Sequence, residues 1–302
     1  MIERGVACFV KLKKGGLNMK IAVTGATGQL GQHVVKGLLE KLSPQDVVAV
    51  VRDPAKATQL AQRGAVVRVA EYGNPDALEK AFAGVERLLL ISSSEVGRRL
   101  VQHRNVIEAA KAAGVKHFVY TSAPQATTTD LIVAPEHKAT EEFIFQSGMP
   151  YTIVRNNWYT ENYLPKVETA RKTGVIVAAA GKGRVASASR ADFAAGAIAV
   201  LLEQGHEGKV YELGGDYAWD YEELAKAIGE IIQKPVVYQS VDPQTLVGIL
   251  KDAGQDEGVA GFVAALDSNI AAGLLAEVTG QLSALIGRPT TPLKKGLTEA
   301  LF

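Results

Sequence analysis

Short apolar runs alternate with longer stretches of helical periodicity through the first half of the chain. The runs are rich in Val, Ile and Leu, the composition typical of strands buried on both faces of a sheet. Strands alternating with helices indicate βαβ units and right-handed crossovers. The sequence therefore predicts an α/β fold with a Rossmann-type, doubly wound parallel sheet. The predicted strands are 21–23, 47–51, 66–70, 88–91, 118–120 and 151–154, and the predicted helices include 56–63, 75–83, 96–113 and 135–146.

This alternation weakens after Trp158. A strand at 175–177, an apolar helix at 191–202 and a strand at 210–213 follow, and the remainder from 220 is rich in Ala and Leu and expected to be mostly helical. We expect a dinucleotide-binding domain and a smaller, mostly helical C-terminal substrate lobe over the crevice. The expected division is 19–160 for the first domain, completed by about 185–215, and 161–184 with 216–302 for the lobe.

A glycine-rich turn links the first strand to an amphipathic helix. Gly25, Gly28 and Gly31 are spaced as in short-chain dehydrogenases, so that the backbone can turn sharply, approach phosphates closely and pack the helix on the sheet. Backbone N–H groups and the positive end of the helix dipole then face a pyrophosphate. The candidate cofactor-binding residues of this turn are Gly25, Thr27, Gly28, Gln29, Leu30 and Gly31.

Two residues after the second strand indicate which nicotinamide cofactor is bound. The adenosine ribose is read about 20 residues after the glycine turn, where Arg52 and Asp53 lie. Asp53 precedes Pro54, so it reads as the cap of a helix, although a capping acid can still reach a ribose. The guanidinium of Arg52 suits the 2′-phosphate of NADPH, and we therefore predict NADPH.

Polar residues follow three further strands. Parallel sheets bind ligands at the carboxyl ends of their strands, so these residues should line one crevice with the glycine turn. We expect the serines to lie near the nicotinamide ribose and the Thr-Ser pair near the cofactor or substrate. The alternative is that both groups only form hydrogen bonds at ordinary strand ends. The candidates are Ser92, Ser93, Ser94, Thr121 and Ser122.

Bulk properties exclude several classes of function. The 302 residues are 47% hydrophobic and 22% charged, with a formal net charge of +1, which gives no general attraction to nucleic acid or anionic membranes. No apolar run is long enough to span a bilayer, so no membrane insertion is expected. The single cysteine, Cys8, fits a cytoplasmic protein without a thiolate nucleophile or a cysteine metal cluster. The first 18 residues read as a tail or an upstream start, and we favour a biological start at Met19.

The usual proton donor of short-chain dehydrogenases is missing. That donor is a tyrosine with a lysine four residues later, and no tyrosine here has lysine at that spacing. Counting back from Glu141, the two positions fall on Val133 and His137. Either the substrate needs no strong acid, or the protein binds cofactor without turnover. Quinones fit the first case, because the hydroquinone anion is a delocalised phenolate and a hydrogen-bond donor with a stacking surface is sufficient.

Several strings in the sequence resemble the NmrA-like atypical short-chain dehydrogenases, and among them the bacterial flavin-free NAD(P)H:quinone oxidoreductases. The resemblance runs from Met19 to about Leu293 and implies NADPH as cofactor, no flavin or metal, and a part for Asn162 in quinone reduction. The strings are Thr24–Gly31, Val51–Pro54, Leu90–Gly97, His103–Ile107, Tyr120–Ser122, Arg155–Tyr163, 205–213 and 285–291.

The residues singled out for catalysis and substrate binding each have a plainer interpretation. Asn162 is expected to donate to a quinone oxygen or to hold the nicotinamide end, against a simple turn or cap role. Trp158 and Tyr159 could stack on a planar ring, although aromatic residues after a strand commonly pack in a wall. His137 could donate a proton, yet a partly exposed helix histidine without a role is the stronger expectation.

The function expected from the sequence is NADPH-dependent reduction of a small-molecule quinone by direct hydride transfer. The alternative is an NADP(H)-sensing regulator without turnover, while a sugar-nucleotide epimerase or ketoreductase is disfavoured by the missing Tyr/Lys pair. A homodimer stays open. The basic residues Arg98, Arg99 and Arg104 read as a solvated helix face, and the scattered histidines form no metal site.

Overall fold

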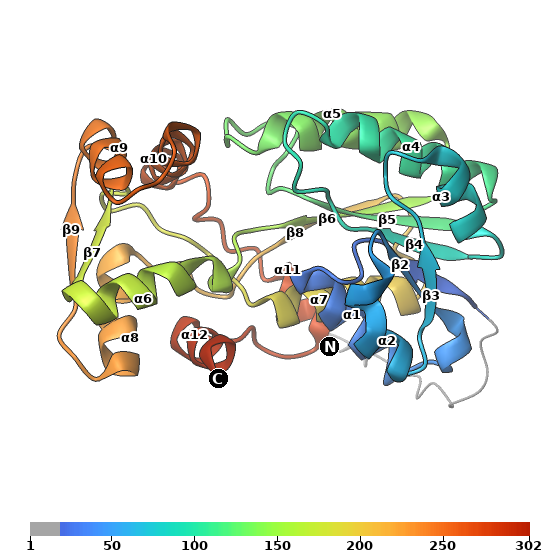
Figure 1. Ribbon diagram of the computed structural model, residues 1–302, viewed down its shortest axis with the longest axis horizontal. Coiled ribbons are helices and arrows are strands. Elements are labelled where there is room, and N and C mark those ends of the chain that lie inside the picture. Colours follow the sequence, from blue (N-terminus) through green and yellow to red (C-terminus); the bar gives the residue numbers. More distant parts are fainter. Residues whose placement is uncertain (1–18) are drawn as a thin grey trace, which may run out of the picture.

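A computed structural model describes residues 19–302; Cys8 and the expected tail before Met19 lie outside the described residues. Seven strands form one parallel sheet in the order β3-β2-β1-β4-β5-β6-β8, which confirms the predicted Rossmann-type fold (Figure 1). The strands are β1 (Ile21–Val23), β2 (Val47–Val51), β3 (Val66–Val69), β4 (Arg87–Leu90), β5 (His117–Ser122), β6 (Tyr151–Asn156) and β8 (Lys209–Leu213).

Helices cover both faces of this sheet. Alternate residues of each strand face opposite sides, so that each face forms a hydrophobic cluster of its own with the helices that cover it. In β1, Ile21 and Val23 pack in one hydrophobic cluster and Ala22 in the other. The first cluster also holds residues of α1 (Gln29–Leu39), α7 (Arg190–Leu202) and α11 (Gln281–Ile286). The second holds residues of α3 (Pro75–Phe82), α4 (Arg99–Ala112) and α5 (Ala134–Ser147).

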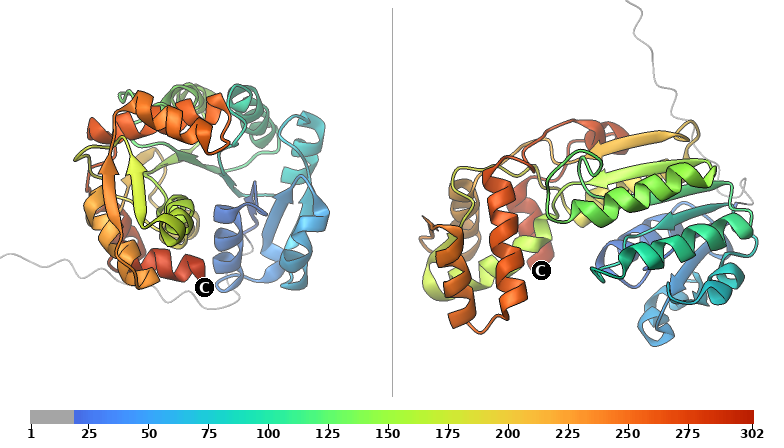
Figure 2. Two further views of the ribbon diagram at one scale, coloured as in Figure 1. Left: turned by 60° about the vertical axis from the view of Figure 1, so that its left-hand side comes forward. Right: turned by 90° about the horizontal axis from the view of Figure 1, so that it is seen from above.

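A third hydrophobic cluster lies beyond the carboxyl ends of the strands of the large sheet. Here β7 (Val175–Ala178) pairs in parallel with β9 (Val237–Ser240), register Val175 to Val237 (Figure 2). The chain after 220 is mostly helical, as predicted, and the short β9, which the sequence did not indicate, is its one strand among the described residues. The surrounding helices are α6 (Leu164–Thr173), α8 (Tyr221–Ile232), α9 (Pro243–Asp252), α10 (Glu257–Ala271) and α12 (Leu293–Leu301).

Two predicted helices begin later than expected. The helix predicted over 96–113 starts at Arg99, because Gly97 takes a positive φ of 86° and ends the preceding turn before the helix can form. The helix predicted over 56–63 divides into a 3-10 turn, η2 (Pro54–Ala57), and the short α2 (Thr58–Gln62). The remaining 3-10 turns are η1 (Pro44–Asp46) and η3 (Thr160–Tyr163).

The strand order reverses beside β1. Strands β2 and β3 lie on one side of β1, and β4, β5, β6 and β8 lie on the other. In open parallel sheets a ligand binds outside the carboxyl ends of the strands at this switch point. The glycine turn after β1 is therefore at the position where the topology opens a crevice. Within residues 19–302, no helix is both long and apolar enough to cross a membrane.

Contact between α1 and the turn after β1 requires a glycine at position 31. A Cβ there would overlap the backbone of Gly25 and lie 2.8 Å from Ala26 Cα. We expect Gly31→Ala to destabilise the protein by about 1–3 kcal/mol, the usual cost of overpacking, measured by urea unfolding. The matched control is Gly248→Ala in α9, where a Cβ meets no atom within 4 Å. That change should be neutral or stabilising by up to about 1 kcal/mol. Equal effects of both substitutions would contradict this account.

Candidate cofactor and substrate site

The glycine turn presents an open helix N-terminus. Gly25 has φ +58°, and the N–H of Gly28 donates to Gly25 O at 2.9 Å, which closes the turn. The Gln32 amide donates to Thr27 O at 2.8 Å and holds the outer side. No side chain caps α1, so that the first N–H groups of the helix, from Gln29 onward, are available to an anion. The turn fits a dinucleotide pyrophosphate.

A hydroxyl pair fixes the ends of the strands beside this turn. Thr24 Oγ1 donates to Leu89 O at 3.2 Å and accepts from the Ile91 N–H at 3.1 Å. The Tyr72 hydroxyl lies 2.6 Å from Thr24 Oγ1 and 2.9 Å from Ile91 O. Burial raises the pKa of Tyr72, so that it stays protonated as a donor. These bonds join β1 to β4 and hold the floor of the crevice.

Of the two residues after β2, Asp53 has the capping role that the sequence predicts, and Arg52 is exposed. Asp53 Oδ1 accepts from the Ala55 N–H at 3.0 Å, with Pro54 at the first position of the turn, which confirms its role as a cap. The Arg52 side chain is 72% exposed, and its Nη1 lies 3.1 Å from Glu95 Oε1. Arg52 is therefore the group after β2 that can turn toward a phosphate.

A buried network holds the serines after β4. The N–H of Ser93 donates to His103 Nε2 at 2.9 Å, and its hydroxyl donates to Gln102 Oε1 at 2.5 Å. Arg99 Nε donates to Ser93 O at 2.7 Å, and its guanidinium pairs with Glu136 at 3.4 Å. Arg99 is buried, which corrects the reading of 98, 99 and 104 as one solvated face. Of the three serines, Ser94 is exposed and Ser92 and Ser93 are half-buried.

The hydroxyls after β5 are used inside the protein. Thr121 Oγ1 accepts from the Ser92 N–H at 2.9 Å, and Ser122 Oγ donates to Glu141 Oε1 at 2.5 Å. Glu141 is fully buried and receives two hydrogen bonds from Arg155, which also pairs with Glu212 at 2.7 Å. These contacts favour the alternative role of Thr121 and Ser122 as hydrogen bonders at strand ends. A direct contact of their hydroxyls with cofactor remains a prediction.

His137 is buried, contrary to the expectation of a partly exposed residue. Its Nδ1 lies 2.7 Å from the Tyr120 hydroxyl, and it is 7% exposed. Burial, together with the nearby charge of Arg99, lowers the pKa of His137 to about 3. The imidazole is thus neutral near pH 7, with Nδ1 in a hydrogen bond to the Tyr120 hydroxyl. It supplies no imidazolium at this pH.

Asn162 lies beside Arg190, a residue that the sequence did not indicate as part of the site. Its Oδ1 accepts from Arg190 Nη2 at 2.9 Å, which fixes the orientation of the amide and leaves Nδ2 free to donate. The Arg190 guanidinium lies 4.7 Å from the centre of the Tyr159 ring and 3.6 Å from Glu161. Arg190 is the first residue of α7, and only its position at the start of a predicted helix could have signalled it.

The two aromatic candidates, Trp158 and Tyr159, pack against other side chains of the protein. One face of the Tyr159 ring is covered by Arg190, and Phe193 packs edge-on at 5.3 Å. Trp158 is half-buried against the cluster of the second lobe. Stacking of either ring on a substrate remains a prediction. Nearby, Asn156 Oδ1 is buried without a partner among the described residues, which leaves an acceptor for a bound molecule.

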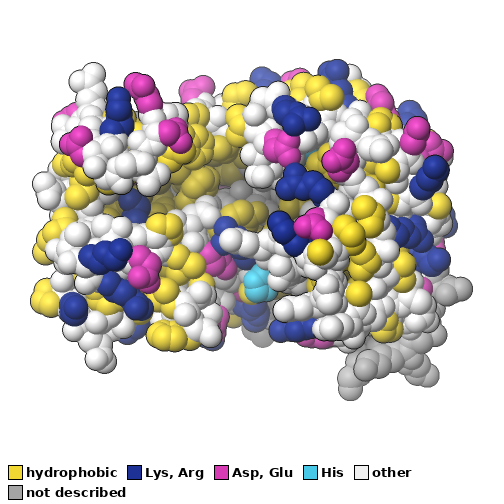
Figure 3. Space-filling model, viewed as in Figure 1, with side chains coloured by type: hydrophobic (Ala, Val, Ile, Leu, Met, Phe, Trp, Pro, Cys, Tyr) yellow, Lys and Arg dark blue, Asp and Glu magenta, His cyan; other side chains and the backbone are white. Residues whose placement is uncertain are grey.

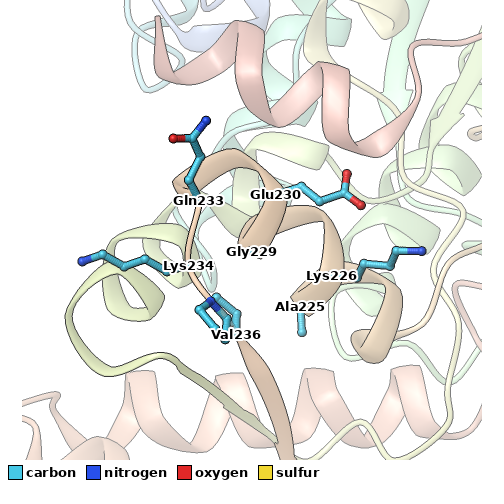
Figure 4. Close-up of a pocket in the computed structure, with 8 residues that line it drawn as sticks. Ala225, Lys226, Gly229, Glu230, Gln233, Lys234 and Val236 are labelled. Carbon is cyan, nitrogen blue, oxygen red and sulfur yellow. The ribbon is translucent and has the colours of Figure 1, made fainter.

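The surface is hollowed between the two sides of the molecule, and hydrophobic side chains line the hollow (Figure 3). A separate concavity of about 360 Å³ lies at α8, where Lys226 and Lys234 point to opposite sides and Glu230 pairs with Lys294 at 2.7 Å (Figure 4). It brings together none of the predicted site residues. Among residues 19–302, no three His, Cys, Asp or Glu side chains are grouped to hold a metal ion.

A family model described as NAD(P)H-binding matches residues 25–204. The chain belongs to this NAD(P)H-binding family. The matched residues include the glycine turn, Arg52, Asn162 and Arg190. The family membership agrees with an open helix N-terminus at the switch point of the sheet.

Relatives of this family member cover nearly the whole chain. Quinone oxidoreductase 2 of Escherichia coli (strain K12) is 49% identical over 279 residues, which are 92% of this chain and 98% of that protein. The crystal structure of the E. coli NADPH-dependent quinone oxidoreductase QOR2 complexed with NADPH has a TM-score of 0.90 at 48% identity, covering 93% of this chain and 100% of the other. These matches confirm the resemblance to NmrA-like quinone oxidoreductases.

A third relative has a different substrate in its name. The triphenylmethane reductase of Citrobacter sp., complexed with NADP(H), has a TM-score of 0.89 at 40% identity and covers 93% of this chain and 100% of that one. The same fold thus carries reductases of at least two kinds of acceptor.

The neutral state of His137 predicts how stability depends on pH. Its pKa is about 3 in the folded protein and 6.5 when unperturbed, so between these values the unfolded state binds more protons. The free energy of unfolding should therefore fall as pH is lowered from 6.5 toward 3, by at most about 1.4 kcal/mol per pH unit from this residue. In His137→Gln this share of the slope should disappear, measured by urea unfolding from pH 4 to 7. The matched control is His33→Gln, an exposed histidine whose substitution should leave the slope of the free energy of unfolding against pH unchanged. The same slope in His137→Gln as in the parent protein would contradict the assignment.

Proposed function

We propose that the protein reduces quinones by direct hydride transfer from NADPH, without flavin or metal. The observation that carries the proposal is that the donor proposed for the substrate, the Asn162 amide, is neutral in a crevice built for a dinucleotide. The Asn162 amide is a neutral donor and His137 carries no positive charge near pH 7, so neither replaces the acidic tyrosine of the usual Tyr/Lys pair. An acceptor whose reduced form is a stable anion suits such a site. The E. coli and Citrobacter relatives support the cofactor and the reductase chemistry.

The chain's own residues hold and orient both reactants. NADPH, when bound, supplies the hydride, while α1 binds its pyrophosphate and Arg52 its 2′-phosphate. Two electrons and one proton pass to the quinone as hydride, and a second proton from water completes the hydroquinone. The Asn162 amide donates to the quinone oxygen that gains negative charge, and Arg190 keeps the amide turned for this.

The same proposal includes the division of the chain into two parts, its location in the cell and its partners. Residues 19–160 and 185–215 form the cofactor-binding part, and 161–184 with 216–302 form the lobe that covers the substrate. The protein acts on small molecules in the cytoplasm, and a homodimer is its proposed assembly. Neither binding of nucleic acid nor insertion into a membrane is part of the proposal.

A direct assay tests the reaction. The protein, NADPH and a simple benzoquinone are mixed, and the absorbance of reduced nicotinamide is followed against a reaction without protein. We expect protein-dependent loss of NADPH and equal formation of hydroquinone in protein freed of flavin. Binding of NADPH without turnover of several quinones would instead favour an NADP(H)-sensing regulator.

Substitution of Asn162 tests the donor. We expect Asn162→Ala to lower kcat about 100- to 1,000-fold, the range seen when one donor to a developing anion is removed, with little change in the Kd for NADPH. Asn162→Asp should be equally impaired, because a carboxylate paired with Arg190 cannot donate. The control is Asn74→Ala, which removes the cap of α3 but no crevice group. A wild-type kcat in both Asn162 variants would reject this role.

A further inference from the structure

Arg52, the proposed ligand of the 2′-phosphate, already has a partner. Arg52 directly follows β2, and Glu95 follows β4; these strands flank β1 on either side. Their ion pair, 3.1 Å from Nη1 to Oε1, therefore extends across the mouth of the crevice above the glycine turn. A phosphate that approaches Arg52 meets a carboxylate bound to the same guanidinium.

Glu95 is anchored, whereas Arg52 is free to move. Glu95 Oε2 accepts from Gln102 Nε2 at 2.9 Å and pairs with Arg98 at 3.3 Å, and the Glu95 N–H donates to Ser93 Oγ at 3.1 Å. Arg52 is 72% exposed, and among the described residues it has no ion pair other than the one with Glu95. A bound phosphate would therefore draw Arg52 away and leave Glu95 in place.

We propose that Glu95 is a specificity-determining residue that competes with the 2′-phosphate of NADPH for Arg52. NADH lacks this phosphate, so its binding leaves the Arg52–Glu95 pair intact, whereas NADPH must break it. Asp53 cannot take this part, because its carboxylate caps Ala55. Glu95 thus narrows the preference for NADPH over NADH that Arg52 provides. The proposal rests on NADPH as the cofactor of the proposed function.

The expected effect is modest, because both partners are exposed. Exposed ion pairs are weak in water, and replacing the carboxylate should tighten NADPH binding about two- to fivefold. The effect should shrink as salt is added, since charges at the surface are screened.

Binding measurements without quinone test this inference. The Kd values of NADPH and NADH are measured at pH 8 and low ionic strength by nicotinamide fluorescence, for the parent protein and for Glu95→Gln. We expect a two- to fivefold lower Kd for NADPH and an unchanged Kd for NADH. Unchanged discrimination between the two cofactors in Glu95→Gln would overturn the proposal.

Two further variants separate competition from a general charge effect. Glu86→Gln is the matched control, because Glu86 pairs with Lys116 at 2.8 Å with closely similar exposure but at the opposite ends of the strands. It should leave both Kd values unchanged. In an Arg52→Ala background, Glu95→Gln should lose most of its effect; an undiminished effect would overturn competition for Arg52.

The outcome is distinguishable from failure of the proposed function. Absence of NADPH binding to the parent protein would reject the cofactor assignment itself. NADPH binding and quinone turnover with equal discrimination in Glu95→Gln would reject only the role of Glu95.

Discussion

The close packing of α1 on the turn after β1 is the constraint on which the site depends. At Gly31 the helix comes so near to the backbone of Gly25 and Ala26 that no Cβ fits between them. This contact aims the uncapped start of α1 at the switch point of the sheet. The N–H groups that a helix cannot satisfy by itself are thereby presented to the crevice, where the proposed function has the pyrophosphate bind.

Buried polar networks fix the other side of the crevice. Arg99 and His103 hold the backbone of Ser93, while Glu141 joins the end of β5 to Arg155. Such groups are costly to bury unless each has a partner, so they define one arrangement of the loops after the strands. The same burial lowers the pKa of His103 to about 2, and both His103 and His137 are therefore neutral at physiological pH.

The crevice consequently combines the exposed guanidinium of Arg52 with the neutral amide of Asn162. Arg52 reaches into solvent after β2, whereas Asn162 has its amide orientation set by Arg190. The cation suits a phosphate of the cofactor, and the neutral amide suits an acceptor that needs little help from an acid.

Local periodicity and neighbouring residues were enough to predict the succession of the sheet strands and of most helices along the chain, the glycine turn and the capping role of Asp53. The sequence could not reveal Arg190 beside Asn162 or Glu95 beside Arg52, since these pairs are 28 and 43 residues apart and meet only when the sheet forms. It also misjudged Arg99 and His137. Burial depends on which helix faces pack together, and only the tertiary structure decides that.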